Sequence, residues 1–230
     1  MFSCILFLAV TLPTIFSSVT GATVISDFAS QNASDHATSI LSERAALGNA
    51  IVSNRCNYDV WLWSVDEKNS PKQSTKIPAR SKHTEKFRTP CPGCGVSMKI
   101  SKTNGLEAGK ITQLEYAIRS DQIYYDISFV DCAKGKSAAN CPGHDKGIRI
   151  DSPESTCRPL NCAGGTYCVK DAYFVDQPKI KLGVPEPVLG CGKGKVGMDV
   201  YFKLCSDAAP LRRDILSVAG RIAVEKASDA

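Results

Sequence analysis

The stretch Ile123-Tyr124-Tyr125-Asp126-Ile127-Ser128-Phe129-Val130-Asp131-Cys132 carries the pattern that decides the fold class of this 230-residue chain. Apolar side chains recur at every second position: Ile123, Tyr125, Ile127 and Phe129. The alternate positions 124, 126 and 128 are polar or amphipathic. A period of two residues is typical of a half-buried β-strand with one side on a core and the other toward solvent.

A second alternating run lies just upstream, at positions 114–119, with Leu114, Tyr116 and Ile118 on its apolar side. Only Ser120-Asp121-Gln122 separates the two runs, which favours an antiparallel hairpin. Both apolar sides can face one core only if the numbers of paired residues sum to an odd value.

Two registers satisfy this condition. A sum of 241 leaves a four-residue loop at 119–122 and sets Glu115 opposite Asp126. A sum of 243 needs a two-residue Asp121-Gln122 turn, which lacks the Gly or Asn that such turns prefer. We therefore predict the register that sums to 241.

This register opposes two carboxylates on a sheet face that we expect to be exposed. Directly opposed side chains have Cβ atoms roughly 5 Å apart, and like charges there are destabilising. Glu115 and Asp126 are therefore either a functional site or two solvated carboxylates, and the pattern alone leaves both open.

Residues 1–22 are predicted to be a secretory signal peptide, with an apolar segment from Cys4 to Val10 and small residues at Thr20-Gly21-Ala22. The apolar segment is too short to span a bilayer, which takes roughly 20 residues. No later stretch is long and apolar enough to do so. We expect a secreted protein that is extracellular or in the cell wall.

Of the 11 cysteines, Cys4 lies in the signal segment, and the even number that remains predicts up to five disulfides in a secreted chain. These residues are Cys56, Cys91, Cys94, Cys132, Cys141, Cys157, Cys162, Cys168, Cys191 and Cys205. A zinc site is disfavoured because Cys91-Pro92-Gly93-Cys94 has no second Cys-x-x-Cys partner and the three histidines form no ligand-spaced cluster. A thioredoxin-like motif would have to open a helix, whereas Pro90 and Gly95 flank this one. We predict disulfides, no metal and no cofactor.

The formal charge of +5 is spread among acidic residues. The densest basic cluster is Arg80, Lys82, Lys86 and Arg88, which we interpret as a solvated loop. It contains a single aromatic residue, Phe87, and no nucleic-acid motif, so we expect no nucleic-acid partner.

Composition divides the rest of the chain. Residues 23–47 are predicted to be a flexible leader or propeptide, which contains the glycosylation sequon at Asn32. The domain is expected at 48–205, with further strands at 50–52, 60–65, 96–100 and 196–204 and an edge strand before Phe87. Residues 132–192 are interpreted as loops held by disulfides. The tail, 206–230, is predicted to form an amphipathic helix after Pro210.

Many short strands with turn signals and no βαβ alternation predict an all-β sandwich of one domain. Three segments resemble thaumatin-like proteins: Asn54-Arg55-Cys56-Asn57-Tyr58-Asp59-Val60-Trp61, the pair Leu114-Glu115-Tyr116 with 125–131, and Cys191-Gly192 through 201–205. The short fungal branch, the antigenic thaumatin-like proteins of the yeast-phase-specific type, is more similar still. It shares Gly48-Asn49-Ala50-Ile51-Val52 and Ser70-Pro71-Lys72-Gln73.

The resemblance implies a thaumatin-like β-sandwich and a bridge between the first and last domain cysteines, Cys56 and Cys205. It also implies that Glu115, Asp126 and Asp131 match acids of the family's cleft. This chain has fewer cysteines than full-length members and lacks their Cys-x-Thr-Gly-Asp-Cys signature, so the loop domain does not carry over. No counterpart of the family's Arg or of its remaining acid is evident. Cys91–Cys94 is our expectation for a local bridge.

Three functions follow as hypotheses. The protein binds carbohydrate such as cell-wall β-glucan through Glu115, Asp126 and Asp131, with Tyr124 as a stacking ring. Alternatively it is a weak endo-β-1,3-glucanase whose catalytic candidates are Glu115 and Asp126, because Asp131 lies roughly 16 Å along a straight strand from Asp126. The third is a secreted antigen or effector that recognises another protein. We expect a monomer.

Overall fold

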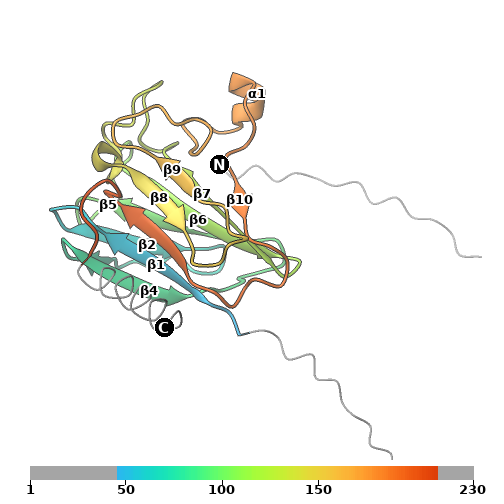
Figure 1. The fold of residues 1–230 in the computed structure, drawn as a ribbon. Helices are drawn as coiled ribbons and strands as arrows, with labels where there is room; N and C mark the ends of the chain where they lie inside the picture. Colours follow the sequence, from blue (N-terminus) through green and yellow to red (C-terminus); the bar gives the residue numbers. More distant parts are fainter. Residues whose placement is uncertain (1–45, 212–230) are drawn as a thin grey trace, which may run out of the picture. The chain divides into compact units, whose positions relative to one another are not determined.

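Figure 1 shows the fold as a computed structural model, which describes residues 46–211. The predicted signal peptide, the sequon at Asn32 and the predicted C-terminal helix beyond residue 211 lie outside this range, as does all but the end of the predicted leader. Among the described residues, no helix is long and apolar enough to cross a membrane.

The strands form two sheets. The five-stranded sheet has the order β4-β1-β11-β8-β9 and comprises β1 (Asn49–Asn54), β4 (Ser81–Lys86), β8 (Ile148–Asp151), β9 (Leu160–Cys162) and β11 (Val200–Leu204). The six-stranded sheet has the order β10-β7-β6-β5-β2-β3 and comprises β2 (Val60–Val65), β3 (Thr75–Ile77), β5 (Gly95–Ser101), β6 (Thr112–Arg119), β7 (Gln122–Ser128) and β10 (Leu189–Gly190). The described helices are a 3-10 turn, η1 (His144–Lys146), and α1 (Pro178–Leu182).

The core receives the apolar side of each alternating strand. From the six-stranded sheet it includes Leu62, Met98, Ile100, Leu114, Tyr116, Ile123, Tyr125 and Ile127, and from the five-stranded sheet Val52, Ile148, Ile150, Val200, Phe202 and Leu204. Burial of a side chain of this size contributes roughly 1.5–3 kcal/mol. The predicted two-sheet, mainly β architecture is confirmed.

The β6–β7 hairpin has the predicted register, since Glu115 pairs with Asp126. The predicted loop was one residue too long at each end, because Arg119 and Gln122 are themselves paired. Ser120 and Asp121 form the turn alone, with φ values of 49° and 59°. Positive φ at both positions gives the turn a twist that matches the flanking strands, and Asp tolerates this region.

The first and last strands of the domain lie side by side. β1 and β11 are parallel, with Asn54 opposite Leu204, so the residues that follow both strands emerge at one end of the sheet. There the Cys56–Cys205 disulfide, the pairing that the resemblance implies, joins segments 149 residues apart.

The region 132–192 was expected to be loops, and this expectation was only partly right. It supplies β8 and β9 to one sheet and β10 to the other. The apolar runs in these strands are too short to stand out in the sequence. Residues 179–182, which were also expected to be loop, form a helical turn, with Pro178 in the first turn and Gly183 at φ 69° after its end. β11 begins at Val200 rather than at 196.

All ten cysteines of the domain are paired. The expected local bridge Cys91–Cys94 is present. The other bridges, which the sequence left open, are Cys132–Cys141, Cys157–Cys191 and Cys162–Cys168.

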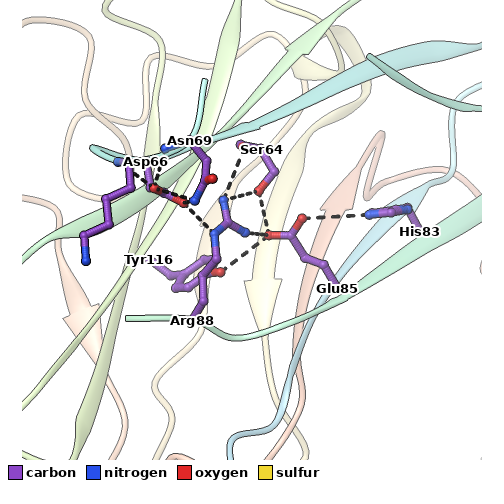
Figure 2. A network of polar contacts seen from close by, with 8 residues as sticks. Ser64, Asp66, Asn69, His83, Glu85, Arg88 and Tyr116 are labelled. Atoms are coloured by element: carbon purple, nitrogen blue, oxygen red, sulfur yellow. Dashed lines mark hydrogen bonds and ion pairs between the residues drawn. The ribbon is translucent and has the colours of Figure 1, made fainter. Parts of the chain in front are cut away.

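A charged network joins Arg88 to residues on or next to β2, β4 and β6 (Figure 2). Arg88 Nε is 2.6 Å from Asp66 Oδ2, and its Nη1 is 2.9 Å from Glu85 Oε1. Ser64 Oγ donates to Glu85 Oε1 at 2.7 Å, and the hydroxyl of Tyr116 donates to it at 3.4 Å. Arg88 was expected in a solvated loop, but these contacts place it between the sheets, where its side chain is 30% exposed.

Asp66 depends on this network because its side chain is fully buried. Burial alone would raise its pKa. Hydrogen bonds from Arg88, Asn69 and the backbone N–H groups of Lys68 and Asn69 outweigh burial and lower the pKa to about 2. An ionised, paired carboxylate therefore holds Arg88 in place.

We expect the Cys56–Cys205 bridge to contribute more stability than the Cys91–Cys94 bridge. The chain-entropy relation gives about 5 kcal/mol for a loop of about 150 residues and about 2 kcal/mol for one of about four. Urea unfolding of the double variants C56S/C205S and C91S/C94S checks this. Equal losses of unfolding free energy would contradict the entropic argument.

Asp66 makes the free energy of unfolding depend on pH in the acidic range. Its pKa is lower in the folded state than in the unfolded state, so its contribution is full above pH ~4 and is lost as the pH falls toward ~2. We expect the wild type to lose roughly 1–3 kcal/mol more than D66N across this window. Urea unfolding at pH 5 and pH 2.5 measures this difference, and parallel pH profiles would contradict it.

Candidate functional site

The outer face of the six-stranded sheet carries polar side chains in rows that run across β5, β6 and β7. One row is Ser97, Glu115 and Asp126, set by the registers of the two strand pairs. The next row is Lys99, Gln113 and Ser128. Strand alternation therefore brings the two predicted acids together.

Asp126 is not the solvated carboxylate that an exposed sheet face would give. Its residue is half-buried, and its Oδ1 is fully buried without a hydrogen-bond partner among the described residues. Burial raises the pKa of Asp126 well above its usual range, and the charge of Glu115 raises it further. Protonated Asp126 can also hydrogen-bond to Glu115, which stabilises the neutral form.

A segment of the disulfide-rich region supplies the rest of this cluster. Tyr173 lies against the end of β7, where its N–H donates to Ile127 O and its C=O accepts from Phe129 N–H, both at 2.8 Å. It is bridged to Ser128, which puts its side chain on the face that carries Asp126.

Three acidic residues affect the pKa of Tyr173. Burial raises the pKa of its hydroxyl, and a hydrogen bond to Glu186 and the charges of Asp126, Glu186 and Glu115 raise it further. We call Glu115, Asp126, Tyr173 and Glu186 the acidic cluster. Sequence reasoning missed Tyr173 and Glu186, because nothing in the pattern around Tyr173 or between Pro185 and Pro187 shows that they return to β7.

Tyr124 lies beside Asp126 on the same face, as predicted from alternation. Its hydroxyl donates to Gln122 Oε1 at 2.9 Å. The neighbouring strand β10 passes close to its ring through Gly190. A Cβ at Gly190 would lie 2.7 Å from Ile123 O and 3.1 Å from Tyr124 Cδ1, so only glycine allows this approach.

Asp131 lies apart from the Glu115–Asp126 pair. Its Oδ2 is 3.7 Å from Lys99 Nζ, and its side chain is 42% exposed. Lys99 also hydrogen-bonds to Gln113 in the adjacent row. Lys99 thus places a cation beside Asp131.

Two groups among the described residues have ligand-type atoms close together: His144 with Cys162 and Cys168, and Glu67 with Cys91 and Cys94. The cysteines of both groups are in disulfides, which lack the thiolate that a metal needs. The acidic cluster forms no such group within the described part of the chain.

Residues 37–206 match the sequence profile of the family described as Blastomyces yeast-phase-specific protein, Bys1. The chain belongs to this family. It is 32% identical over 174 residues to the "Antigenic thaumatin-like protein" of Arthroderma benhamiae, covering 72% of this chain and 83% of that protein. It is 26% identical over 130 residues to the "Secreted thaumatin-like protein calA" of Emericella nidulans, covering 56% and 71%. The resemblance to the short fungal thaumatin-like proteins is therefore confirmed.

Solved structures are also similar to this Bys1-family chain. The protein elicitor MoHrip2 from Magnaporthe oryzae matches with a TM-score of 0.49 and 24% identity over 69% of this chain and 99% of that one. The thaumatin-like xylanase inhibitor TLXI matches with a TM-score of 0.40 and 12% identity over 66% and 97%.

The raised pKa of Asp126 predicts a stabilising substitution. Its folded-state pKa lies above the unfolded value, so its stabilising contribution is present at low pH and is lost as the pH rises through the folded-state pKa. We expect D126N to be more stable than wild type at pH 8 by roughly 1–3 kcal/mol, the cost of a buried unpaired group. The gain should be absent at pH 3.5.

Urea unfolding of both proteins at the two pH values measures this gain. Glu107→Gln is the matched control, because Glu107 is exposed and ion-paired to Lys110. A D126N protein that is no more stable than wild type at pH 8 would contradict the burial of an unpaired carboxyl.

Proposed function

We propose that this protein is a secreted carbohydrate-binding protein that holds cell-wall β-glucan on the acidic cluster. The observation that carries the proposal is the Glu115–Asp126 pair, in which burial and like charge favour a shared proton. The cysteine content of the chain and the names of its relatives support an extracellular setting.

The pair has the hydrogen-bonding capacity that sugar hydroxyls need. A carboxyl that keeps its proton donates one hydrogen bond, while the other oxygens of the pair accept hydrogen bonds. Tyr173 adds a hydroxyl whose raised pKa keeps it protonated. Tyr124 adds an aromatic ring on the same face, a suitable surface for the apolar side of a sugar.

The same geometry argues against hydrolysis. Glycosidases hold their two carboxyl groups ~5–5.5 Å apart for retention or ~6.5–9.5 Å apart for inversion. Carboxyl groups that hydrogen-bond to each other bring two oxygens within about 2.5–2.7 Å. A proton shared between Asp126 and Glu115 would therefore place their carboxyl groups closer together than either mechanism requires.

Recognition of another protein is the second candidate, and α1 favours it. Ile180 is 79% exposed and Leu182 is 41% exposed on this short helix. Lys179 and Lys181 flank Ile180. A protein partner would contact the exposed apolar side chains of this helix.

The deciding experiment is a pull-down on insoluble β-1,3-glucan, with an assay for released sugar run in parallel. We expect the double variant E115Q/D126N to bind at least about tenfold more weakly than wild type, equivalent to about 1.4 kcal/mol, because neither carboxyl group of the pair remains to accept sugar hydroxyls. We expect no sugar release from either protein. E107Q should bind like wild type.

Equal binding by the double variant and wild type would overturn the acidic cluster as the binding site. Sugar release by wild type that disappears in the double variant would establish the glucanase instead. A wild type that binds no glucan, with a protein partner lost on Ile180→Asp substitution, would support recognition through α1.

A further inference from the structure

The Cys91–Cys94 bridge differs from the other disulfides in its surroundings. Both of its cysteines are half-buried, whereas each of the other four bridges contains at least one cysteine that is no more than 5% exposed. Its turn is open, since Gly93 has φ 76° and a Cβ there would have no neighbour within 4 Å. A molecule from solution can therefore reach this bridge.

A carboxylate faces both sulfurs of this bridge. Glu67 Oε2 lies 2.9 Å from Cys91 Sγ and 2.8 Å from Cys94 Sγ. A disulfide has no proton to donate, so this oxygen meets two weak acceptors. In the dithiol form, each S–H could donate a hydrogen bond to the carboxylate. The position of Glu67 thus suits the reduced pair better than the oxidised one.

The fold holds Glu67 in this position. Glu67 lies in the turn after β2, where Asp66 Oδ1 accepts from the backbone N–H groups of Lys68 and Asn69 at 2.9 Å each. Arg88, three residues before Cys91, bonds to the same Asp66 at 2.6 Å. Figure 2 shows this ion pair, which ties the turn that carries Glu67 to the segment that leads into the bridge.

The other side of the turn is also fixed. Arg119, at the end of β6, donates from Nη2 to Gly93 O at 2.8 Å. The backbone N–H of Cys94 donates to Cys91 O at 3.1 Å, which closes the turn. The backbone around the sulfurs therefore has partners that do not depend on the S–S bond.

We propose that Cys91-Pro92-Gly93-Cys94 is a thiol–disulfide exchange site, with Glu67 as its proton acceptor and donor. Its substrate class is a dithiol, either two cysteine thiols of an extracellular protein or a pair of glutathione molecules. The site is separate from the acidic cluster and does not depend on the proposed glucan binding.

The exchange is a two-electron transfer. A substrate thiolate attacks one sulfur of the bridge and forms a mixed disulfide, while the other sulfur leaves as a thiolate and is protonated through Glu67. The second substrate thiol, after losing its proton, displaces the bound cysteine. The products are a substrate disulfide and the Cys91/Cys94 dithiol, and the reverse sequence reoxidises the pair.

A titration of the full secreted protein with reduced and oxidised glutathione tests the proposal. Samples are quenched with acid and alkylated, and the redox state of each cysteine is read from peptide masses. We expect Cys91 and Cys94 to become reduced while the other four bridges stay oxidised. We expect E67Q to shift the equilibrium roughly tenfold toward the disulfide, about 30 mV, because an amide accepts the thiol hydrogen bonds less strongly.

E107Q is the matched control, since it removes another exposed carboxylate at the far end of β5 and β6, and it should titrate like wild type. A second readout is the thiol pKa of the reduced pair, which should fall in E67Q because a negative neighbour is removed. C91S/C94S should stay folded and fail to oxidise a model dithiol peptide. Reduction of all five bridges together, or E67Q and E107Q with identical titrations, would overturn the proposal.

Discussion

The parallel pairing of β1 with β11 is the constraint on which the rest of the sandwich depends. It places the first and last strands of the domain at the centre of the five-stranded sheet, and the Cys56–Cys205 bridge locks them together. Every other strand lies between them in sequence. The five-stranded sheet can therefore close only after the whole domain is available, and such long-range pairing is slow to form. The β2–β5–β6–β7 strands pair with nearer neighbours in sequence and need no such closure.

Two buried carboxyl groups in this protein show opposite electrostatics. Asp66 is buried beside Arg88, and its pKa is lowered to about 2. Asp126 is buried beside Glu115, and its pKa is raised. The first arrangement favours the charged form and holds loops together. The second arrangement favours the protonated form of Asp126 and contributes no ion pair to the fold. Carboxyl groups with perturbed pKa values concentrate at functional sites. This contrast separates a structural network from a candidate ligand site.

The sequence was sufficient wherever a strand alternates cleanly and pairs with its neighbour. Period-two alternation limited the β6–β7 register to two possibilities, and turn chemistry selected the observed one and hence the Glu115–Asp126 pair. Parity excluded every register with an even sum, because a one-residue slip would turn every apolar side chain to the outer face. The same reasoning failed for β8, β9 and β10, whose two to four residues are too short to show a period.

The sequence predicted two members of the acidic cluster, Glu115 and Asp126, but not the other two. Tyr173 and Glu186 reach β7 through a chain path set by tertiary hydrogen bonds and disulfides rather than by local pattern. The expectation that Arg88 lies in a solvated loop was also wrong. A basic residue in a charged run does not indicate that it will pair with a buried carboxylate, here Asp66. Local pattern determines faces and registers, whereas contacts between distant loops remain hidden until the fold is known.

The disulfides differ in the structural role that each one has. The Cys162–Cys168 bridge ends five residues before Tyr173, and the Cys157–Cys191 bridge ends five residues after Glu186. They restrain both ends of the segment that completes the acidic cluster, where few strand hydrogen bonds are available to do so. Cys91–Cys94, by contrast, closes a turn that Arg88 and Arg119 already fix. A bridge whose backbone is held by other contacts can open without loss of the fold, which is the condition for redox chemistry at that position.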